Sequence, residues 1–426
     1  MWHDALRTVE KSQTLLLNEQ SHHLEDTGRE VFKFGFGQLP FPPLEAATAA
    51  LRAHAARKDY SPVPGLPELR MRVAEFHSVA DQIRVDADQV LVAPGSKSLI
   101  YTALAAFKRA DVLIPAPAWV SYEPQARLLG HQALRVATSF EQRWRVHAQA
   151  IDTAVSLKTD RTVPSVLILN HPGNPEGLGY DDDELQVIAS VCRKHRILVI
   201  SDEIYGLLDH AGAHVSLARH YPEGTIVTGG LSKWCGAGGW RLGVAMLPAQ
   251  LQGDFKDTML GIASETYSCA ATPVQKAACE AYRWDEVTIG YLQHQRRLLS
   301  TLGQRIATEL TAAGARVHAP TGGFYLLPDF SDRAELLARR GIQSSQQLCV
   351  RLLADTGVAL LPGDAFGLSP ARLCARLAYV DFDGHEALKA SREIGLAKPL
   401  DEAAMQALFG KTLRGIRKLT KWLDAL

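Results

Sequence analysis

Residues 229–243, GGLSKWCGAGGWRLG, place a single lysine, Lys233, in a loop that is rich in glycine. The apolar run 225–227 precedes the loop and has the composition of a buried strand, and a second apolar run, 242–246, follows it. Glycine lets the backbone approach a bulky partner closely, whereas a lysine ammonium is strongly hydrated and costly to bury. Lys233 is therefore either a surface lysine whose charged end reaches water or a lysine that takes part in chemistry, and this segment alone leaves both open.

The loop differs from the two common phosphate-binding motifs that are rich in glycine. A P-loop requires G-x-x-x-x-G-K-[ST], which the segment lacks, and the glycines of a Rossmann fingerprint open a helix. Here we expect a strand to follow the glycines, with Arg241 at its start. The sequence thus argues against a nucleotide-binding loop of either kind.

Short runs rich in Val, Ile and Leu recur through the middle of the chain, and stretches of helical pattern separate most of them. This alternation is typical of an α/β fold with a mainly parallel, buried sheet. Two of the runs lead into the polar segments 167–177 and 199–206, at the carboxyl ends of their strands, where open α/β sheets bind ligands. The runs are 90–92, 112–114, 166–169, 197–200, 225–227 and 242–246, and helical stretches include 98–108 and 183–194.

The pattern changes after about Tyr291 into a long helical stretch and then into a smaller α+β unit. The length of 426 residues suggests two domains. We expect residues 1–45 to form an N-terminal arm that joins the small domain, residues 46–290 the large domain, and residues 291–426 the small C-terminal domain. The strand-like pieces of the small domain are 324–327, 358–361 and 376–380.

The last segment, residues 401–426, has apolar residues at helical spacing with basic residues between them. We interpret it as a terminal helix that packs on the small domain. The alternative is a basic amphipathic helix that lies on a membrane surface.

The composition bears on several function classes. The 46 Lys and Arg residues balance the 46 Asp and Glu residues, so no overall positive field favours nucleic acid or an anionic membrane. The apolar runs are far too short to span a bilayer, and the N-terminus lacks the pattern of a signal peptide, so we expect a cytoplasmic protein. The 6 cysteines lie far apart, with no C-x-x-C pair and no histidine at zinc-finger spacing. They predict reduced thiols, mostly in the core, and no metal site.

Three segments combine the residue types of one chemistry in a fixed chain order. Asn174 lies in N-H-P-G-N-P-E-G, Asp202 and Tyr205 lie in S-D-E-I-Y, and Lys233 follows. This arrangement resembles the fold-type I aminotransferases of classes I and II, which depend on pyridoxal phosphate (PLP), from about Phe34 to Val380. Further motifs in the family's order are F-G-Q-L-P-F (36–41), Y-S-P-V-P-G-L-P-E-L-R (60–70), P-G-S-K-S (94–98), P-A-P-A-W-V-S-Y (115–122), G-G-F-Y (322–325), G-V-A-L-L-P-G-D-A-F-G (357–367) and R-L-A-Y (376–379).

The resemblance implies a role for each residue. Lys233 would form the Schiff base with the cofactor aldehyde and move the proton between the substrate α-carbon and the cofactor. Asp202 would pair with the pyridine nitrogen, Asn174 and Tyr205 would hydrogen-bond the 3′ oxygen, and Trp119 would stack on the ring. Lys233, Asp202 and Tyr205 are thus the expected catalytic residues. Taken singly, Asp202 is also typical of a helix cap or surface ion pair, Asn174 of a turn, and Trp119 of a core.

The resemblance also implies a phosphate site that two subunits share. Gly95 and Ser96 would present backbone N–H groups at a helix N-terminus, and Arg241 would bind the phosphate with two parallel hydrogen bonds. In the family, the tyrosine that matches Tyr60 reaches the phosphate from the other subunit, so we expect a homodimer.

One departure from the family concerns cofactor affinity rather than the type of reaction. The family usually has Ser or Thr three residues before the lysine, where this chain has Gly230. The phosphate hydroxyl ligand is then missing unless Ser232 or Ser96 supplies it.

The substrate site follows from the same resemblance. Arg376 matches the arginine that binds the substrate α-carboxylate, and the backbone of Gly37 would lie beside that group. An exposed arginine at a strand edge is the alternative for Arg376. Trp119 and Asn174 are expected to contact the substrate as well.

The resemblance implies that Lys97, in the phosphate loop, contributes to cofactor binding, and the same residue bears on the choice of substrate. P-G-S-K-S followed by P-A-W-V-S-Y resembles the bacterial type Iβ aspartate aminotransferases, in which the matching lysine contacts the side-chain carboxylate of acidic substrates. Lys97 therefore predicts an acidic donor, and a solvent-facing lysine at a helix start is the alternative. The chain departs from that subgroup with G-Q-L-P-F at 37–41 in place of G-E-P-D-F, and with Tyr267.

The resemblance predicts a two-step transamination. PLP would take the amino group from an L-amino acid, preferably aspartate or glutamate, and pass it to a 2-oxo acid such as 2-oxoglutarate. A PLP-dependent lyase, cyclase or synthase of the same fold would use the same cofactor residues and stays open. A transcription regulator with an aminotransferase-like domain is a further alternative, disfavoured because the stretch before Phe34 is short for a DNA-binding domain.

Overall fold

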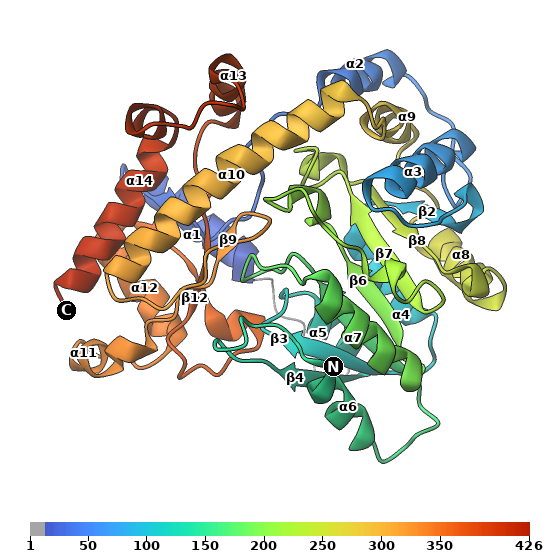
Figure 1. Cartoon of the computed structure of the whole chain (residues 1–426), viewed down its shortest axis with the longest axis horizontal. Helices are drawn as coiled ribbons and strands as arrows, with labels where there is room; N and C mark the ends of the chain where they lie inside the picture. The colour runs from blue at the N-terminus through green and yellow to red at the C-terminus, as the bar shows by residue number, and fades with distance from the viewer. Residues whose placement is uncertain (1–12) are drawn as a thin grey trace, which may run out of the picture.

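The centre of the computed structural model, which describes residues 13–426, is a seven-stranded sheet covered by helices on both faces (Figure 1). The strand order is β2-β8-β7-β6-β5-β3-β4. Only β8 runs antiparallel to its neighbours within this sheet, so the expected α/β fold with a mainly parallel sheet is confirmed. The strands are β2 (Val90–Ala93), β3 (Asp111–Ala116), β4 (Gln132–Ala137), β5 (Ser165–Asn170), β6 (Leu198–Asp202), β7 (Thr225–Gly230) and β8 (Gly243–Met246).

The central strands are mainly apolar in their middle positions because both of their faces are covered. In β5, Val166 and Ile168 join a hydrophobic cluster on one face of the sheet, and Leu167 and Leu169 join a cluster on the other. The helices of this part are α2 (Glu45–His54), α3 (Pro67–Ala80), α4 (Ser96–Ala105), α5 (Tyr122–Leu128), α6 (Ala148–Ser156), α7 (Asp182–Lys194), α8 (Asp254–Thr266) and α9 (Thr272–Ala281).

Two local features differ from the sequence-based expectation. Strand β4 lies at the edge of the sheet, where its side chains are mostly exposed or half-buried, so it lacks the apolar run that identifies the other strands. Arg241 does not begin the strand after the glycine-rich loop. It follows a short 3₁₀ helix, Gly238–Trp240, in the left-handed backbone region with φ 54°, and β8 begins at Gly243.

A second group of elements follows the central sheet along the chain (Figure 1). A three-stranded antiparallel sheet has the order β11-β12-β9, and β1, from the N-terminal part, pairs in parallel with β10. The long helix α10 crosses position 290, where we expect a domain boundary. The elements are α1 (Gln13–Asp26), β1 (Phe32–Lys33), α10 (Glu286–Ala312), β9 (Tyr325–Leu326), α11 (Ala334–Arg339), α12 (Ser345–Thr356), β10 (Val358–Ala359), β11 (Leu361–Pro362), β12 (Ala375–Ala378), α13 (Gly384–Ile394) and α14 (Glu402–Asp424).

The β1–β10 pairing supports the proposal that the N-terminal arm belongs with the small domain. Residues 1–12 of that arm lie outside the described residues. The division of the chain into residues 1–45, 46–290 and 291–426 therefore stays a proposal.

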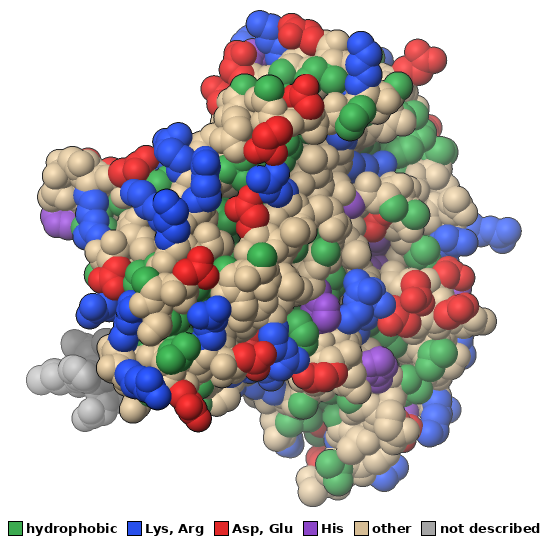
Figure 2. Space-filling model, turned by 60° about the vertical axis from the view of Figure 1, so that its left-hand side comes forward, with side chains coloured by type: hydrophobic (Ala, Val, Ile, Leu, Met, Phe, Trp, Pro, Cys, Tyr) green, Lys and Arg blue, Asp and Glu red, His purple; other side chains and the backbone are tan. Residues whose placement is uncertain are grey.

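The terminal helix packs on the protein, as its pattern predicts. Met405, Leu413, Ile416 and Leu419 of α14 are buried in the main hydrophobic cluster, so the face that a membrane helix would expose is covered. On the face shown in Figure 2, basic and acidic side chains are interspersed. Within the described part of the chain, no helix has the length and hydropathy needed to span a membrane.

All six cysteines are free thiols, as predicted. Cys192, Cys235, Cys349 and Cys374 are buried, and Cys269 and Cys279 are half-buried.

Candidate active site

A cavity of about 470 Å³ lies where the carboxyl ends of β5 and β6 meet the loop that follows β7 and the strands β9 and β12. It brings together side chains from segments far apart in the sequence. All but two of the predicted site residues line it, namely Gly37, Ser96, Lys97, Trp119, Asn174, Asp202, Tyr205, Ser232, Lys233, Arg241 and Arg376.

Asp202 ends β6 as a buried carboxylate inside this cavity. Tyr122 donates a hydrogen bond of 2.6 Å to its Oδ2, and Thr228 donates one of 3.3 Å to its Oδ1. Burial raises the pKa of Asp202 to about 6, and the hydrogen bond from Tyr122 opposes this rise. A cationic N–H group placed against Asp202 would favour its ionised form, so the site is suited to a protonated ring nitrogen.

Lys233 extends its amine across the cavity to the N-terminal segment. Its Nζ donates a hydrogen bond of 2.9 Å to the carbonyl oxygen of Gly37, and it lies 5.6 Å from the ring centres of Tyr205 and Phe324. No carboxylate is paired with Lys233 among the described residues. The amine is thus held by one neutral acceptor, which a reacting group is able to replace.

A polar network joins the predicted 3′-oxygen ligands to the predicted carboxylate ligand. Asn174 Nδ2 donates to Tyr205 Oη at 3.5 Å, and Tyr205 Oη lies 3.1 Å from Tyr325 Oη. Arg376 donates from Nη1 to Asn174 Oδ1 at 3.0 Å and from Nη2 to the carbonyl oxygen of Gly35 at 2.7 Å. Burial raises the pKa of Tyr205 well above its usual value, so its hydroxyl stays protonated.

Arg376 is a buried cation whose partners are neutral. It is 2% exposed, its Nε has no hydrogen-bond partner among the described residues, and the rings of Tyr325 and Phe366 lie 4.7 and 5.0 Å from its guanidinium carbon. Burial lowers its pKa, as expected for a charge without a carboxylate beside it. A buried arginine with unused donors is a site for an anion, and a carboxylate fits its planar fork.

The N-terminus of α4 and the glycine-rich loop form a cradle with little room for side chains. Gly95 precedes α4 with φ 90° and offers no side chain to cap its N–H groups. A Cβ at Gly95 would overlap the guanidinium of Arg241, and a Cβ at Gly243 would overlap the backbone of Ser96. Arg241 Nη1 lies 3.4 Å from Ser232 Oγ, which it approaches as a donor. Helix N–H groups, an arginine and hydroxyls converge here, as a phosphate requires.

The structure explains why a glycine stands at position 230, where the family resemblance leads us to expect Ser or Thr. Its φ is 150°, and an added Cβ would lie 2.5 Å from Leu242 O and 2.8 Å from Gly243 Cα, which are backbone atoms of the paired strand β8. A serine at this position would strain the β7–β8 pairing. Ser232 and Ser96, which both line the cavity, are the available hydroxyl donors.

We therefore expect Gly230→Ala to lower the free energy of unfolding by about 2–3 kcal/mol, because the backbone of β8 must shift. Urea unfolding of the purified variant measures this change. Gly229→Ala is the matched control, since its Cβ would meet only Val244 Cγ2, at 4.0 Å. Equal effects of the two substitutions would contradict the strain at position 230.

Lys97 and Trp119 form one wall of the cavity. Lys97 Nζ lies 4.9 Å from the centre of the Trp119 ring. Burial lowers the pKa of Lys97, and the nearby Arg241 lowers it further. Two cations close to each other without a carboxylate between them indicate that this end of the cavity takes up anions.

Two predicted site residues lie outside the cavity lining. Gly95 adjoins it through Arg241, as described above. Tyr60 has a side chain that is 89% exposed and does not reach the cavity of its own chain.

The cavity also contains residues that sequence reasoning did not single out. Tyr122 binds Asp202 and Tyr325 binds Tyr205, and both residues are the last letters of motifs used for the family resemblance. Asn170 ends β5, and its Nδ2 donates to the carbonyl oxygen of Asp202 at 2.8 Å. The sequence signal that could have identified Asn170 is a polar residue at the last position of an apolar strand. Other residues that line the cavity are Phe36, Gln38, Val120, Ser121, Ile204, Gly238 and Gly239.

Glu176 places an unusual carboxyl group behind the cavity. Its Oε2 is buried with no hydrogen-bond partner, and a Cβ at Gly173 would overlap its Oε1. Together with Tyr122 and Asn174 it lines a small void of about 20 Å³. Burial raises the pKa of Glu176 to about 8, so the folded protein holds a proton here that the unfolded chain loses above its ordinary pKa of 4.5.

Stability contributed by this proton should fall as the pH rises from about 4.5 to about 8. Glu176→Gln removes the titration, so we expect the variant to exceed the unsubstituted protein in free energy of unfolding by about 4–5 kcal/mol at pH 9. At pH 5 the two should be nearly equal. Urea unfolding at both pH values tests this, with the exposed Glu265→Gln as control. A difference that does not change with pH would rule out Glu176 as the titrating group.

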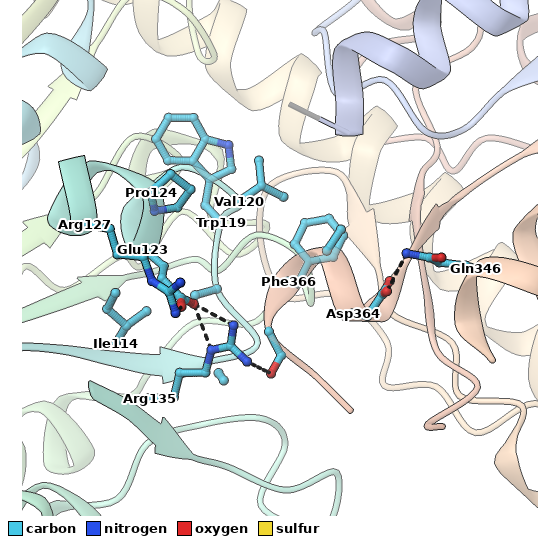
Figure 3. A pocket seen from close by; sticks show the side chains of 14 residues that line it. Ile114, Trp119, Val120, Glu123, Pro124, Arg127, Arg135, Gln346, Asp364 and Phe366 are labelled. Atoms are coloured by element: carbon cyan, nitrogen blue, oxygen red, sulfur yellow. Dashed lines mark hydrogen bonds and ion pairs between the residues drawn. The ribbon is translucent and has the colours of Figure 1, made fainter. Parts of the chain in front are cut away.

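A second cavity of about 370 Å³ adjoins the first and shares Trp119 with it (Figure 3). Its charged groups are paired among themselves. Arg135 binds Glu123 and reaches the carbonyl oxygen of Gly367, and Gln346 Nε2 donates to Asp364 at 2.9 Å. With its charges satisfied, this cavity is a weaker candidate for binding an anionic ligand than the first.

The main cavity gathers Lys97, Lys233, Arg241 and Arg376, an arrangement suited to an enzyme that acts on an anionic substrate with a lysine amine. Comparison with known families makes this specific: the model described as "Aminotransferase class I and II" matches residues 29–383. The chain belongs to this aminotransferase family, and it is a transaminase with the fold of that family.

Curated relatives and solved structures agree with the family. The chain is 32% identical over 371 residues to an aspartate aminotransferase of Bacillus sp. (strain YM-2). The aligned region covers 85% of this chain and 91% of the relative. It is 30% identical over 370 residues to an asparagine–oxo-acid transaminase of Streptococcus mutans, with coverage of 84% and 90%. The structure of Thermus thermophilus aspartate aminotransferase with maleate superposes with a TM-score of 0.80 at 26% identity, covering 91% of this chain and 98% of that one.

Proposed function

We propose that this chain binds PLP in the main cavity and transfers the amino group of an acidic L-amino acid to a 2-oxo acid, with 2-oxoglutarate as acceptor. The observation that carries the proposal is the cavity itself. Lys97, Lys233, Arg241 and Arg376 line it, and Asp202 is its one acidic lining residue among those described. A phosphate and a dicarboxylate substrate would balance this excess of positive charge.

Three features of the cavity suit PLP: a cradle for its phosphate, a buried carboxylate for its ring nitrogen and a lysine amine for its aldehyde. The cradle of Gly95, Gly243 and Arg241 excludes side chains and presents N–H donors, as a phosphate group needs. Asp202 offers a buried carboxylate for the ring nitrogen, and Lys233 is the amine within the same cavity. When bound, PLP supplies a conjugated ring that takes up the electrons of the substrate α-carbon.

The protein's own residues would position the substrate and move the proton. Arg376 would bind the α-carboxylate through its free donors and so fix the orientation of the α-carbon. Lys233 Nζ would leave Gly37 O and carry the proton to and from the α-carbon. Asn174 is held by Arg376 and Tyr205, so substrate binding at Arg376 is linked to the 3′-oxygen ligands.

The test is a half-reaction of the purified protein saturated with PLP. L-Aspartate alone should convert the cofactor stoichiometrically to its aminated form, seen as loss of the visible absorption band, and 2-oxoglutarate should restore the band. A PLP-dependent lyase would instead release ammonia and an oxo acid without an acceptor. No spectral change with aspartate, glutamate or asparagine would refute the proposed substrate class.

Lys97 provides a test of substrate selection within the proposed reaction. Lys97→Ala should lower kcat/KM for aspartate and glutamate by about 10- to 100-fold and leave kcat/KM for alanine nearly unchanged, because only acidic donors lose an ion pair. The exposed Lys108→Ala, beyond the end of α4, is the control. A uniform loss for all donors would assign Lys97 to the cofactor rather than to selection.

We further propose a cytoplasmic homodimer in which Tyr60 completes the phosphate site of the other subunit. The 89% exposure of this aromatic side chain supports an intermolecular role. Sedimentation velocity should show a dimer at micromolar concentration, and Tyr60→Ala should weaken PLP binding. A monomer with unchanged PLP affinity in this variant would contradict the proposal.

A further inference from the structure

A buried cluster of three side chains lies outside both cavities. The His–Glu–His cluster consists of His171, which follows β5, Glu203, which follows β6, and His214. One ligand atom of each residue lies within 4.8 Å of the others, and no other group of His, Cys, Asp or Glu in residues 13–426 meets this condition. These three residues have no assigned role in the proposed transamination.

Glu203 is fixed from one side and open on the other. Its Oε1 accepts hydrogen bonds from Ser201 Oγ at 2.7 Å, Ser216 Oγ at 3.0 Å and Leu217 N at 3.2 Å. Its Oε2 lies 3.0 Å from His214 Nε2. The hydroxyls and the backbone N–H thus orient the carboxylate so that Oε2 faces His214, as outer partners do in metal sites.

His171 lacks the partner that a buried imidazole requires. Its side chain is 1% exposed, and neither ring nitrogen has a hydrogen-bond partner among the described residues. Its Nε2 points toward Glu203, at 3.7 Å from Oε1. Since buried polar atoms are nearly always satisfied, this geometry indicates a missing ligand.

Space and charge at the cluster suit a cation. A small void of about 20 Å³, sufficient for one water molecule, lies on the Glu203 and His214 side of the cluster and is also bordered by Asp81, whereas His171 does not line it. Gly206 leaves room for the imidazole, because a Cβ there would lie 2.7 Å from His214 Cδ2.

We propose that the His–Glu–His cluster binds one Zn²⁺, with the void supplying a water as fourth ligand. Two imidazoles, a carboxylate and water are an ordinary tetrahedral donor set for zinc. Zinc bonds of about 2.0–2.1 Å place tetrahedral donors about 3.3 Å apart. His214 Nε2 lies 3.0 Å from Glu203 Oε2, and His171 Nε2 lies 3.7 Å from Glu203 Oε1, so the two imidazoles face the two oxygens of one carboxylate and the donors must shift by less than about 1.5 Å to close around an ion. Zinc would replace the proton between His214 and Glu203.

The role of this ion is structural. None of the three residues lines the main cavity, so the ion has no access to the substrate. It would tie together the segments after β5 and β6, which carry Asn174 and Tyr205. Zinc would therefore stabilise the fold at the back of the active site.

The test uses the full chain saturated with PLP, stripped of metals with a chelator, and free of amino acids. Calorimetric titration with Zn²⁺ should show one tight equivalent, and mass spectrometry of metal content should confirm one zinc per chain after dialysis. His171→Ser should weaken zinc binding by at least about 100-fold. His131→Gln, a substitution of another buried histidine, should bind zinc like the unsubstituted protein.

His214→Asn is a second variant in case His171→Ser does not fold. Zinc binding that is unchanged in either variant would overturn the proposal, because the ion would then sit elsewhere. Absence of a stoichiometric zinc in the folded, unsubstituted protein would also overturn it and leave the cluster as a proton-sharing triad. These readouts are independent of transamination, so they stand or fall separately from the proposed function.

Discussion

Replacing Lys233 with alanine is expected to lower kcat/KM for transamination by at least about 10⁴-fold. In the proposed reaction its amine holds the cofactor covalently and carries the proton at the substrate α-carbon, and no other amine in the described chain replaces both functions. Lys97 is the other lysine in the cavity, but its Nζ lies over Trp119, next to the phosphate cradle. The fold should tolerate the change, because the Lys233 side chain makes a single hydrogen bond within residues 13–426, to Gly37 O.

Steady-state kinetics with aspartate and 2-oxoglutarate measures the loss, and circular dichroism verifies the fold. Borohydride reduction followed by peptide mass spectrometry should find the cofactor on Lys233 in the unsubstituted protein and no adduct in Lys233→Ala. Lys194→Ala removes a lysine that pairs with Asp152 at the surface, so its activity should stay within about twofold. Activity in Lys233→Ala above one hundredth of the original would contradict the assigned role.

The sequence was informative about the site where single segments carry the chemistry. Asp202 and Lys233 each follow a buried apolar run, so the sheet alone places them at one edge. The order of Asn174, Asp202, Tyr205 and Lys233 along the chain then identified the family, which the match to residues 29–383 confirmed. The helical pattern of α14 was equally clear, because its apolar stripe is buried.

Contacts between residues far apart in the chain could not be predicted from the sequence. The Tyr122–Asp202 and Asn174–Arg376 hydrogen bonds join residues that only the folded chain brings together. The edge strand β4 escaped notice because exposed positions interrupt its apolar pattern.

Two residues, Gly230 and His171, are conspicuous in the sequence, but only the structure shows what surrounds them. From the sequence, Gly230 stands where a phosphate-binding hydroxyl is expected, whereas in the structure a Cβ at this position would overlap the backbone of Leu242 and Gly243, which explains the glycine. His171 stands in the Pro- and Gly-containing loop after β5 with no pattern that links it to Glu203 or His214. The metal-ligand spacings that sequence motifs describe are local, and this cluster is assembled from three separate segments.

Arg376→Leu is expected to lower kcat/KM by at least about 10³-fold for every amino donor, because all of them share the α-carboxylate. The substitution removes a buried cation whose Nε has no hydrogen-bond partner among the described residues. It also releases Asn174 Oδ1 and so disturbs the residue that is proposed to bind the 3′ oxygen. The loss should appear in both kcat and KM, whereas Lys97→Ala should affect only acidic donors.

Arg376→Lys separates the charge from the planar fork. Lysine keeps the positive charge but presents a point donor, so activity should recover only partly, to roughly one tenth to one hundredth of the original. Arg372→Lys is the matched control on the segment before β12, because Arg372 pairs with Asp329 at 2.8 Å and lies outside the cavity. Full activity in Arg376→Lys would mean that charge alone binds the carboxylate. Full activity in Arg376→Leu would mean that the substrate carboxylate binds elsewhere, and the unsatisfied buried guanidinium would then require another anion to explain it.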